Sequence, residues 1–257
     1  MRSLLSRFDA FLAPAPEPAR VAWLKDWTYA HRGLHAPGGA VENSPAAFRA
    51  AIAAGLGIEC DIQRSRDHAA MVYHDWDFAR LHGDTGTGAA HDATEWRALR
   101  YAYGDEGPIA LSDLLEMVAG QVPLLIEIKS RRGYDVHRSC KSVNAALAGY
   151  AGRHGVMSFD PRVSRWFYRH EPTRLRGLVM REDAYGHTQR AWQRHAALWV
   201  ARPDFIAYHV KALPNRFAAS LRARGVPLLT WTVDSPSARE TAKAHADGSI
   251  AEGAGLG

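Results

Sequence analysis

The feature that most constrains the fold is a repeated alternation of short apolar runs with amphipathic segments of helix length, beginning at Trp27. Short apolar runs are typical of buried strands, and apolar residues spaced three or four apart are typical of helices. The predicted strands are 27–31, 57–63, 71–74, 123–129, 156–159, 175–180, 204–208 and 227–233, with a last short one near 249–250. The predicted helices are 44–54, 112–119, 136–151, 161–169, 188–200, 214–224 and 235–246.

This alternation predicts an α/β fold, either a closed TIM (β/α)8 barrel or an open doubly wound sheet. The length of 257 residues suits one barrel, which commonly uses about 250 residues. The barrel is favoured because no Gly-x-Gly-x-x-Gly turn follows the first strand, and because the polar residues of chemical interest stand at the ends of several strands. We expect one barrel domain over 27–257, with 76–108, rich in Gly, Asp and Thr, as a small inserted subdomain.

Residues 1–26 are expected to form an appendage. Apolar residues between Leu4 and Leu12 have helical spacing, and a proline-rich stretch follows at 14–18. A helix packed on the main domain is favoured over a membrane-surface helix, because no cluster of basic residues accompanies the apolar ones. No apolar run approaches the ~20 residues needed to span a bilayer, so we expect no stable membrane insertion. The two cysteines, Cys60 and Cys140, form no disulfide framework, which favours a reducing, cytoplasmic location.

The net charge of +5 permits several classes of partner. The basic residues are scattered, and no basic stripe interleaved with aromatic residues or zinc-finger spacing is present, so nucleic-acid binding is not expected. A small anionic substrate suits the same charge. The oligomeric state is left open by the sequence.

Carboxylates concentrate in two of the predicted strands. Glu59 and Asp61 flank Cys60, and Glu127 precedes Lys129 by two residues, so each pair lies on one face of its strand. In the simplest structural interpretation these are strand-edge residues and an exposed ion pair. Carboxylates buried on one face must instead meet water, share a proton or bind a cation. Three hard oxygen donors without a Cys or His cluster favour Mg²⁺ or Ca²⁺ over zinc.

Two histidines, His31 and His74, close predicted strands. Active sites of barrels lie where strands give way to loops, whereas a lone histidine at a strand end is commonly a structural residue. Their combination with the three carboxylates makes a catalytic pair the stronger interpretation.

Read in order, the motifs resemble those of the glycerophosphodiester phosphodiesterase family over roughly residues 27–253. The motifs that carry the resemblance are Ala30-His31-Arg32-Gly33, Glu42-Asn43-Ser44-Pro45, Glu59-Cys60-Asp61-Ile62, His74-Asp75, Leu111-Ser112-Asp113-Leu114, Ile126-Glu127-Ile128-Lys129, Ser158-Phe159-Asp160-Pro161 and Trp231-Thr232-Val233. Each is short, but their order makes the match specific. His68 departs from the pattern, because it stands in a turn where glycine is customary.

The resemblance implies a TIM barrel with a small insertion after the His-Asp motif, and hydrolysis of glycerophosphodiesters to glycerol 3-phosphate and an alcohol during phospholipid breakdown. It implies a role for each of nine residues. Glu59, Asp61 and Glu127 would hold one divalent cation, Mg²⁺ or Ca²⁺; His31 and His74 would be the acid/base pair; and Arg32 and Lys129 would contact phosphate. Asn43, also counted with the substrate-binding residues, would lie near the metal or stabilise the loop that carries it, and Trp231 would line the glycerol or leaving-group pocket.

Two other functions remain open. A phospholipase D-like lyase acting on lysophospholipids or sphingolipids shares the barrel and the paired histidines, although its secreted members carry a disulfide-braced loop that two lone cysteines do not suggest. A barrel that binds phosphate esters without catalysis is the second.

Overall fold

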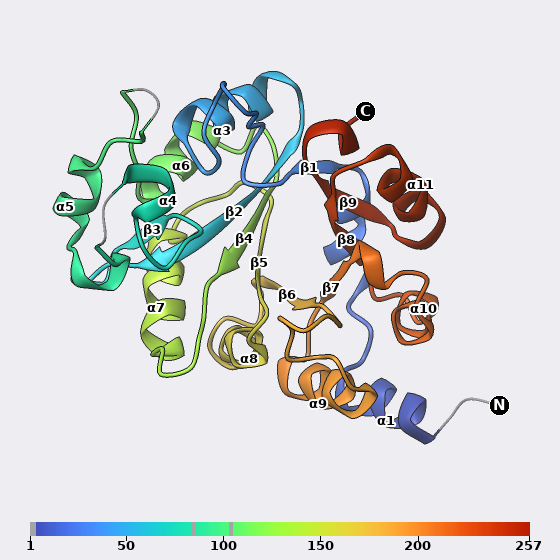
Figure 1. The fold of residues 1–257 in the computed structure, drawn as a ribbon. Helices are drawn as coiled ribbons and strands as arrows, with labels where there is room; N and C mark the ends of the chain where they lie inside the picture. Colours follow the sequence, from blue (N-terminus) through green and yellow to red (C-terminus); the bar gives the residue numbers. More distant parts are fainter. Residues whose placement is uncertain (1–3, 84–85, 103–104) are drawn as a thin grey trace. The chain divides into compact units, whose positions relative to one another are not determined.

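The computed structural model describes residues 4–83, 86–102 and 105–257 (Figure 1). The chain divides into two compact units. Unit 1 contains the chain up to Thr28 together with Gly155–Gly257, and unit 2 is Tyr29–His154.

Unit 2 is built on the strand β2 (Gly57–Arg64). Parallel to it run β1 (Thr28–Ala30), with Ala30 opposite Ile58, and β4 (Leu124–Ile128), with Asp61 opposite Glu127. Every residue of β4 is buried, as its apolar sequence predicts. Gly57 permits the close approach of β1, because a Cβ there would lie 2.6 Å from a ring carbon of Tyr29.

The predicted strand at 71–74 is β3 (Ala70–Val72), and its expected place as a barrel strand is wrong. It runs antiparallel to β2, with Ile62 opposite Val72 and Arg64 opposite Ala70. Only residues 65–69 connect the two strands, and a parallel connection needs about a dozen residues or more. The tight turn uses His68 at φ 71°, the left-handed region that explains why glycine is customary there.

Helices cover unit 2 where amphipathic segments were predicted. They are α3 (Pro45–Ala53), α6 (Leu111–Val118) and α7 (Val136–Ala146), and the hydroxyl of Ser44 accepts from the Ala47 N–H to cap α3. The segment 76–108 contains α4 (Ala79–His82), the 3₁₀ turn η2 (Gly88–Ala90) and α5 (Ala93–Ala98), around buried aromatic residues such as Phe78 and Trp96. Part of the Gly-rich run at 83–88, residues 84–85, lies outside the described residues.

Among its described residues, unit 1 contains five strands. They lie side by side in the order β5, β6, β7, β8 and β9, and each neighbouring pair is parallel. The strands are β5 (His154–Ser158), β6 (Leu175–Met180), β7 (Phe205–His209), β8 (Leu228–Val233) and β9 (Gly248–Ala251). The helices between them are α8 (Pro161–His170), α9 (Ala191–Ala201), α10 (Arg216–Ala223) and α11 (Pro236–His245), with 3₁₀ turns η3 (Val210–Ala212) and η4 (Gly253–Gly255).

The amino-terminal residues of unit 1 form the predicted helix α1 (Leu4–Leu12), then α2 (Pro18–Val21) and η1 (Ala22–Lys25). The carboxylate of Asp9, only 3% exposed, accepts hydrogen bonds from His195 Nδ1 and Trp199 Nε1 of α9, both at 2.8 Å. Arg224 donates to the backbone oxygens of Asp9 and Ala13. These contacts attach α1 to α9, which lie side by side in Figure 1.

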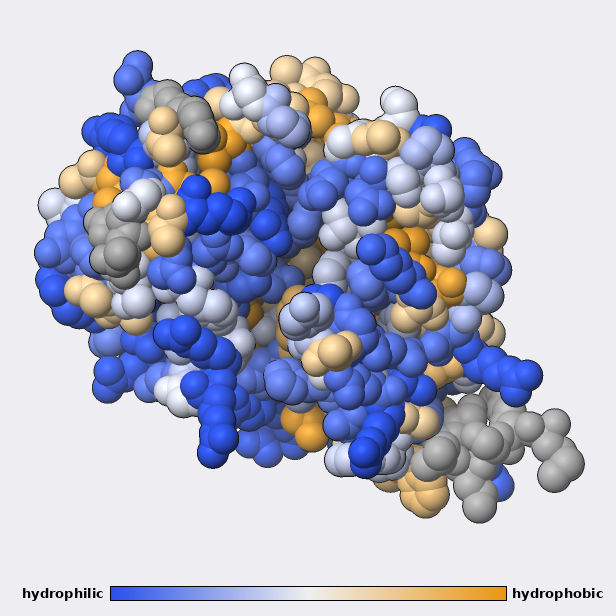
Figure 2. Space-filling model, viewed as in Figure 1, coloured by the Kyte–Doolittle hydropathy of each residue, from blue (hydrophilic) through white to orange (hydrophobic). Residues whose placement is uncertain are grey.

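The face drawn in Figure 2 is mostly hydrophilic. Cys60 and Cys140 are both buried, and they form no disulfide with each other. Among the described helices, none has the length and apolar character needed to cross a bilayer.

Candidate active site

Three carboxylates meet inside unit 2, as the sequence predicts. Glu59 and Asp61 lie on one face of β2, and the parallel register brings Glu127 of β4 opposite Asp61. One oxygen of each lies within 4.8 Å of the others, and the three residues are 2%, 2% and 7% exposed. The alternative of exposed edge carboxylates is therefore wrong.

Two cations partly balance these charges. Lys129 Nζ lies 3.3 Å from Asp61 Oδ1 and 3.2 Å from Glu127 Oε1. Arg32 Nε lies 3.2 Å from Asp61 Oδ2, and the Arg32 backbone N–H donates to Glu59 Oε2 at 3.1 Å. Both residues predicted to contact phosphate thus lie beside the carboxylates.

The burial of the cluster separates the acidities of its members. Burial raises the pKa of Glu59 well above its ordinary value, and the charges of Asp61 and Glu127 raise it further. Burial acts in the same direction on Asp61, but the charges of Lys129 and Arg32 outweigh it and hold the pKa of Asp61 well below its usual range. Glu59 is thus the carboxylate of the trio that burial and neighbouring charge make hardest to ionise, and a divalent cation would offset the repulsion among the three.

The loop after β1 carries two residues in the left-handed region, Arg32 at φ 55° and Asn43 at φ 56°. The Asn43 N–H donates to the Arg32 oxygen at 2.8 Å, which joins the two turns. Asn43 Nδ2 donates to Asp61 Oδ2 at 3.0 Å, and its Oδ1 accepts from the Asp61 N–H at 3.3 Å. Asn43 therefore holds the central carboxylate, Asp61, and its role in the reaction stays a prediction. Gly33, at φ 80°, continues the turn where a Cβ would lie 2.9 Å from Ala47.

His74 lies in the loop after β3, and its Nδ1 is 2.6 Å from Asp75 Oδ1. Gln63, on the same face of β2 as Asp61, donates from Nε2 to the backbone oxygens of His74 and Asp75. The loop that carries the predicted catalytic histidine is thus fixed to the strand that carries two of the carboxylates.

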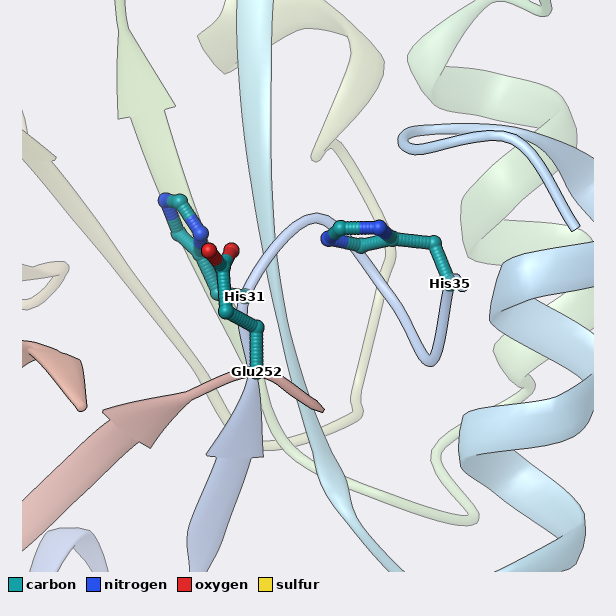
Figure 3. Close-up of side chains that lie close together, drawn as sticks. All are labelled: His31, His35 and Glu252. Carbon is teal, nitrogen blue, oxygen red and sulfur yellow. The ribbon is translucent and has the colours of Figure 1, made fainter. Parts of the chain in front are cut away.

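His31 follows β1 directly, and His35 lies in the same loop with a ring nitrogen within 4.8 Å of one on His31 (Figure 3). Glu252, also drawn in Figure 3, belongs to unit 1. His35 was not singled out by the sequence, and the signal that could have found it is its spacing of four residues from His31.

Two further residues missed by the sequence reasoning lie beside these groups. Glu42 Oε1 accepts from Arg32 Nη1 at 2.8 Å, and both Glu42 oxygens accept from Arg80 of α4. Glu42 was visible beside Asn43 in a family-like motif, whereas Arg80 had no distinguishing sequence signal.

Trp231 lies on β8 of unit 1, half-buried, where its Nε1 donates to the Ala207 oxygen at 3.1 Å. Its ring contacts Phe159 edge-to-face, with centroids 5.2 Å apart, and the Arg181 guanidinium lies 5.6 Å from its centroid. The assignment of Trp231 to the glycerol or leaving-group pocket stays a prediction.

The sequence model of the glycerophosphoryl diester phosphodiesterase family matches residues 31–252. Among curated proteins, no sequence gives a significant match. Several solved structures are similar to this one over most of the chain. A phosphodiesterase from Oleispira antarctica in complex with the product sn-glycerol-3-phosphate is 19% identical, with a TM-score of 0.75 over 88% of this chain and 92% of that chain. Glycerophosphodiester phosphodiesterases from Thermotoga maritima (23% identical, TM-score 0.70, 87% and 93% covered) and Parabacteroides distasonis (20%, 0.70, 88% and 92%) are also similar.

These similarities confirm the predicted fold class. Apart from the antiparallel β3, eight strands are described, and the helices fall between them in the order of a TIM (β/α)8 barrel.

Proposed function

Since the chain belongs to the glycerophosphoryl diester phosphodiesterase family, we propose that it hydrolyses glycerophosphodiesters with one divalent cation and a pair of histidines. The chain is thus an enzyme of the phosphoric diester hydrolase class. The observation that carries the finer proposal is the buried trio Glu59, Asp61 and Glu127 with two cationic side chains against it.

The donor set fits a hard cation. Three carboxylates offer only oxygen, which Mg²⁺ and Ca²⁺ prefer, and Asn43 keeps Asp61 in place. A bound cation would supply positive charge against the phosphate oxygens. The Arg32 guanidinium and the Lys129 ammonium would bind the same phosphodiester, and they stabilise charge that grows on its oxygens towards the transition state.

His31 and His74 would then carry out the two proton transfers of the reaction. One imidazole takes the proton from the adjacent glycerol hydroxyl as its oxygen bonds to phosphorus, and the other gives a proton to the alcohol oxygen as the old P–O bond breaks, which leaves a cyclic phosphate and a free alcohol. Each such positioned group is typically worth about 10²–10⁴ in rate. Water then opens the cyclic phosphate and the two histidines return to their starting protonation, so one glycerophosphodiester and one water give one glycerol 3-phosphate and one free alcohol.

The test is a panel of glycerophosphodiesters with different head groups, assayed for glycerol 3-phosphate before and after EDTA treatment. We expect activity that EDTA abolishes and that Mg²⁺ or Ca²⁺ restores better than Zn²⁺. His31→Ala and His74→Ala should each lose about 100-fold or more in kcat, while His187→Ala, an exposed histidine of unit 1, keeps the parent rate. Full activity in either catalytic variant, or in EDTA, contradicts the proposal.

Identification of the products distinguishes the proposed hydrolase from the alternative, a phospholipase D-like lyase. A phospholipase D-like lyase would release choline from lysophosphatidylcholine and leave a cyclic phosphate, whereas the proposed hydrolase leaves glycerol 3-phosphate.

We also propose a cytoplasmic location, because both cysteines are buried without a disulfide. Fractionation of cells that make the full chain tests this location.

A further inference from the structure

The hydrogen-bond partners of His74 extend well beyond its own loop. Asp75 accepts from the imidazole with Oδ1, and its other oxygen, Oδ2, accepts from Arg80 Nε at 2.6 Å. Arg80 stands in the first turn of α4, in the inserted segment. The imidazole, the carboxylate and the guanidinium thus form a row in which the carboxylate has one oxygen for each neighbour.

The remaining nitrogens of Arg80 bind a second carboxylate. Nη1 donates to Glu42 Oε2 at 2.9 Å and Nη2 donates to Glu42 Oε1 at 2.6 Å, the paired geometry that arginine forms with carboxylates. Glu42 Oε1 also accepts from Arg32 Nη1. The Arg80 guanidinium therefore links Asp75, which contacts His74, to Glu42, which contacts Arg32.

The negative charge of Asp75 determines which ring nitrogen of His74 carries the proton. Burial would raise the pKa of Asp75, but hydrogen bonds from His74 and Arg80 hold it well below its usual range. An ionised Asp75 can only accept, so the proton of the neutral imidazole is on Nδ1 and the lone pair is on Nε2. A lone pair on Nε2 is what a proton acceptor needs.

The same geometry argues against a second cation at Glu42, His74 and Asp75, whose ligand atoms come within 4.8 Å of one another. Arg80 already supplies positive charge to both carboxylates. Burial would raise the pKa of Glu42, but hydrogen bonds from Arg80 and the charge of Arg32 lower it. Both acids thus have a cationic partner from the protein itself.

We propose that Arg80 and Glu42 are positioning residues, which act through Asp75 to hold the His74 imidazole with Nε2 presented and through Arg32 to hold the phosphate-binding guanidinium. The proposal rests on the catalytic roles proposed above for His74 and Arg32. It gives the inserted segment a part in the reaction, because α4 supplies the cation that joins both sides of the site.

The first test compares Arg80→Ala with a matched control. Arg97 lies in the same segment, pairs with Asp113 at 2.7 Å, and has a side chain 47% exposed against 48% for Arg80. We expect Arg80→Ala to lower kcat about 10–100-fold, the usual effect of removing a residue that orients an active-site ligand, with KM changed less than about threefold. Arg97→Ala should leave both constants unchanged. Equal effects in the two variants overturn the proposal.

Rescue separates positioning from a folding defect. Ethylguanidinium added at millimolar concentration should restore part of kcat to Arg80→Ala and nothing to the double variant Arg80→Ala/Asp75→Asn, which lacks the carboxylate that the added cation must bind. Arg80→Lys should be intermediate, because an ammonium cannot make the paired contact with Glu42 while reaching Asp75. If rescue fails in a variant with native circular dichroism, the proposal is wrong.

A third measurement does not depend on turnover. Nitrogen-15 shifts of the His74 ring report which nitrogen carries the proton, and the resonance is assigned by its loss in His74→Gln. The parent should have Nδ1 protonated, and Arg80→Ala should be a mixture of both tautomers. An unchanged tautomer in Arg80→Ala overturns the positioning role. A parent protein inactive on every glycerophosphodiester would instead overturn the proposed function.

Discussion

Asn43 offers the sharpest quantitative test of how the site is held together. Replacing it with alanine removes the donor to Asp61 Oδ2 and the acceptor for the Asp61 N–H, and the two residues are only 1% and 2% exposed. A hydrogen bond to a charged group contributes about 1.5–3 kcal/mol and a neutral one about 0.5–1.5 kcal/mol. The lost bonds alone therefore lower the free energy of unfolding by about 2–4 kcal/mol.

The backbone adds a second effect that a control can isolate. At φ 56°, alanine is strained by about 1–2 kcal/mol, whereas glycine adopts this conformation without strain. Glycine loses about 0.4–1 kcal/mol of that advantage through the greater freedom of the unfolded chain. Asn43→Gly should therefore be more stable than Asn43→Ala by roughly 0.5–1 kcal/mol, although both lack the same side-chain bonds.

Urea unfolding of the two variants and the parent, followed by circular dichroism in EDTA, measures these differences from the midpoints at equal slope. Asn43→Asp is a further control, because it keeps the acceptor for the Asp61 N–H but faces Asp61 with a like charge. If Asn43→Ala unfolds within about 0.5 kcal/mol of the parent, the anchoring role is refuted. If alanine equals or exceeds glycine in stability, the argument from backbone strain is wrong.

Two further predictions concern charge. Because the pKa of Glu59 is raised above its ordinary 4.5, the metal-free parent should lose stability as the pH rises through that raised value, and Glu59→Gln should flatten this slope. Urea unfolding in EDTA at several pH values between about 5 and 8 measures the dependence of stability on pH. An identical slope in the variant would refute the prediction. Asp9→Ala should lower the free energy of unfolding by about 2–3 kcal/mol, since His195 and Trp199 lose their acceptor; an unchanged thermal midpoint contradicts this, and the exposed Glu240→Ala is the control.

The carboxylate trio was predictable because strand periodicity is local. Alternate residues of one strand share a face, so Glu59 and Asp61 follow from sequence, and Glu127, the residue before the end of the parallel neighbour β4, completes the set. The direction of β3 was also accessible in principle, since five residues cannot make a parallel crossover.

What sequence could not provide is the pairing of distant side chains. Arg80 and Glu42 are 38 positions apart, and no periodicity links an exposed arginine of a short helix to one particular glutamate. Their meeting depends on how the inserted segment packs. Asn43 was foreseen only through family resemblance, because nothing local predicts a left-handed asparagine with both amide atoms on one aspartate.

The pairing of β3 has one more consequence. Ile58 of β2 pairs with both β1 and β4, and Ile62 pairs with both β3 and β4, so β1 and β3 occupy the same edge of β2 in succession. Because β3 runs antiparallel to β2, the chain leaves β3 towards Asp61, whose backbone oxygen accepts from the Tyr73 N–H at 2.9 Å, so the inserted segment begins beside the ion-binding end of β2. The register of β2 and β4, which places the three carboxylates, does not involve this segment, so its later residues could change while Arg80 at the start of α4 and the carboxylates keep their places.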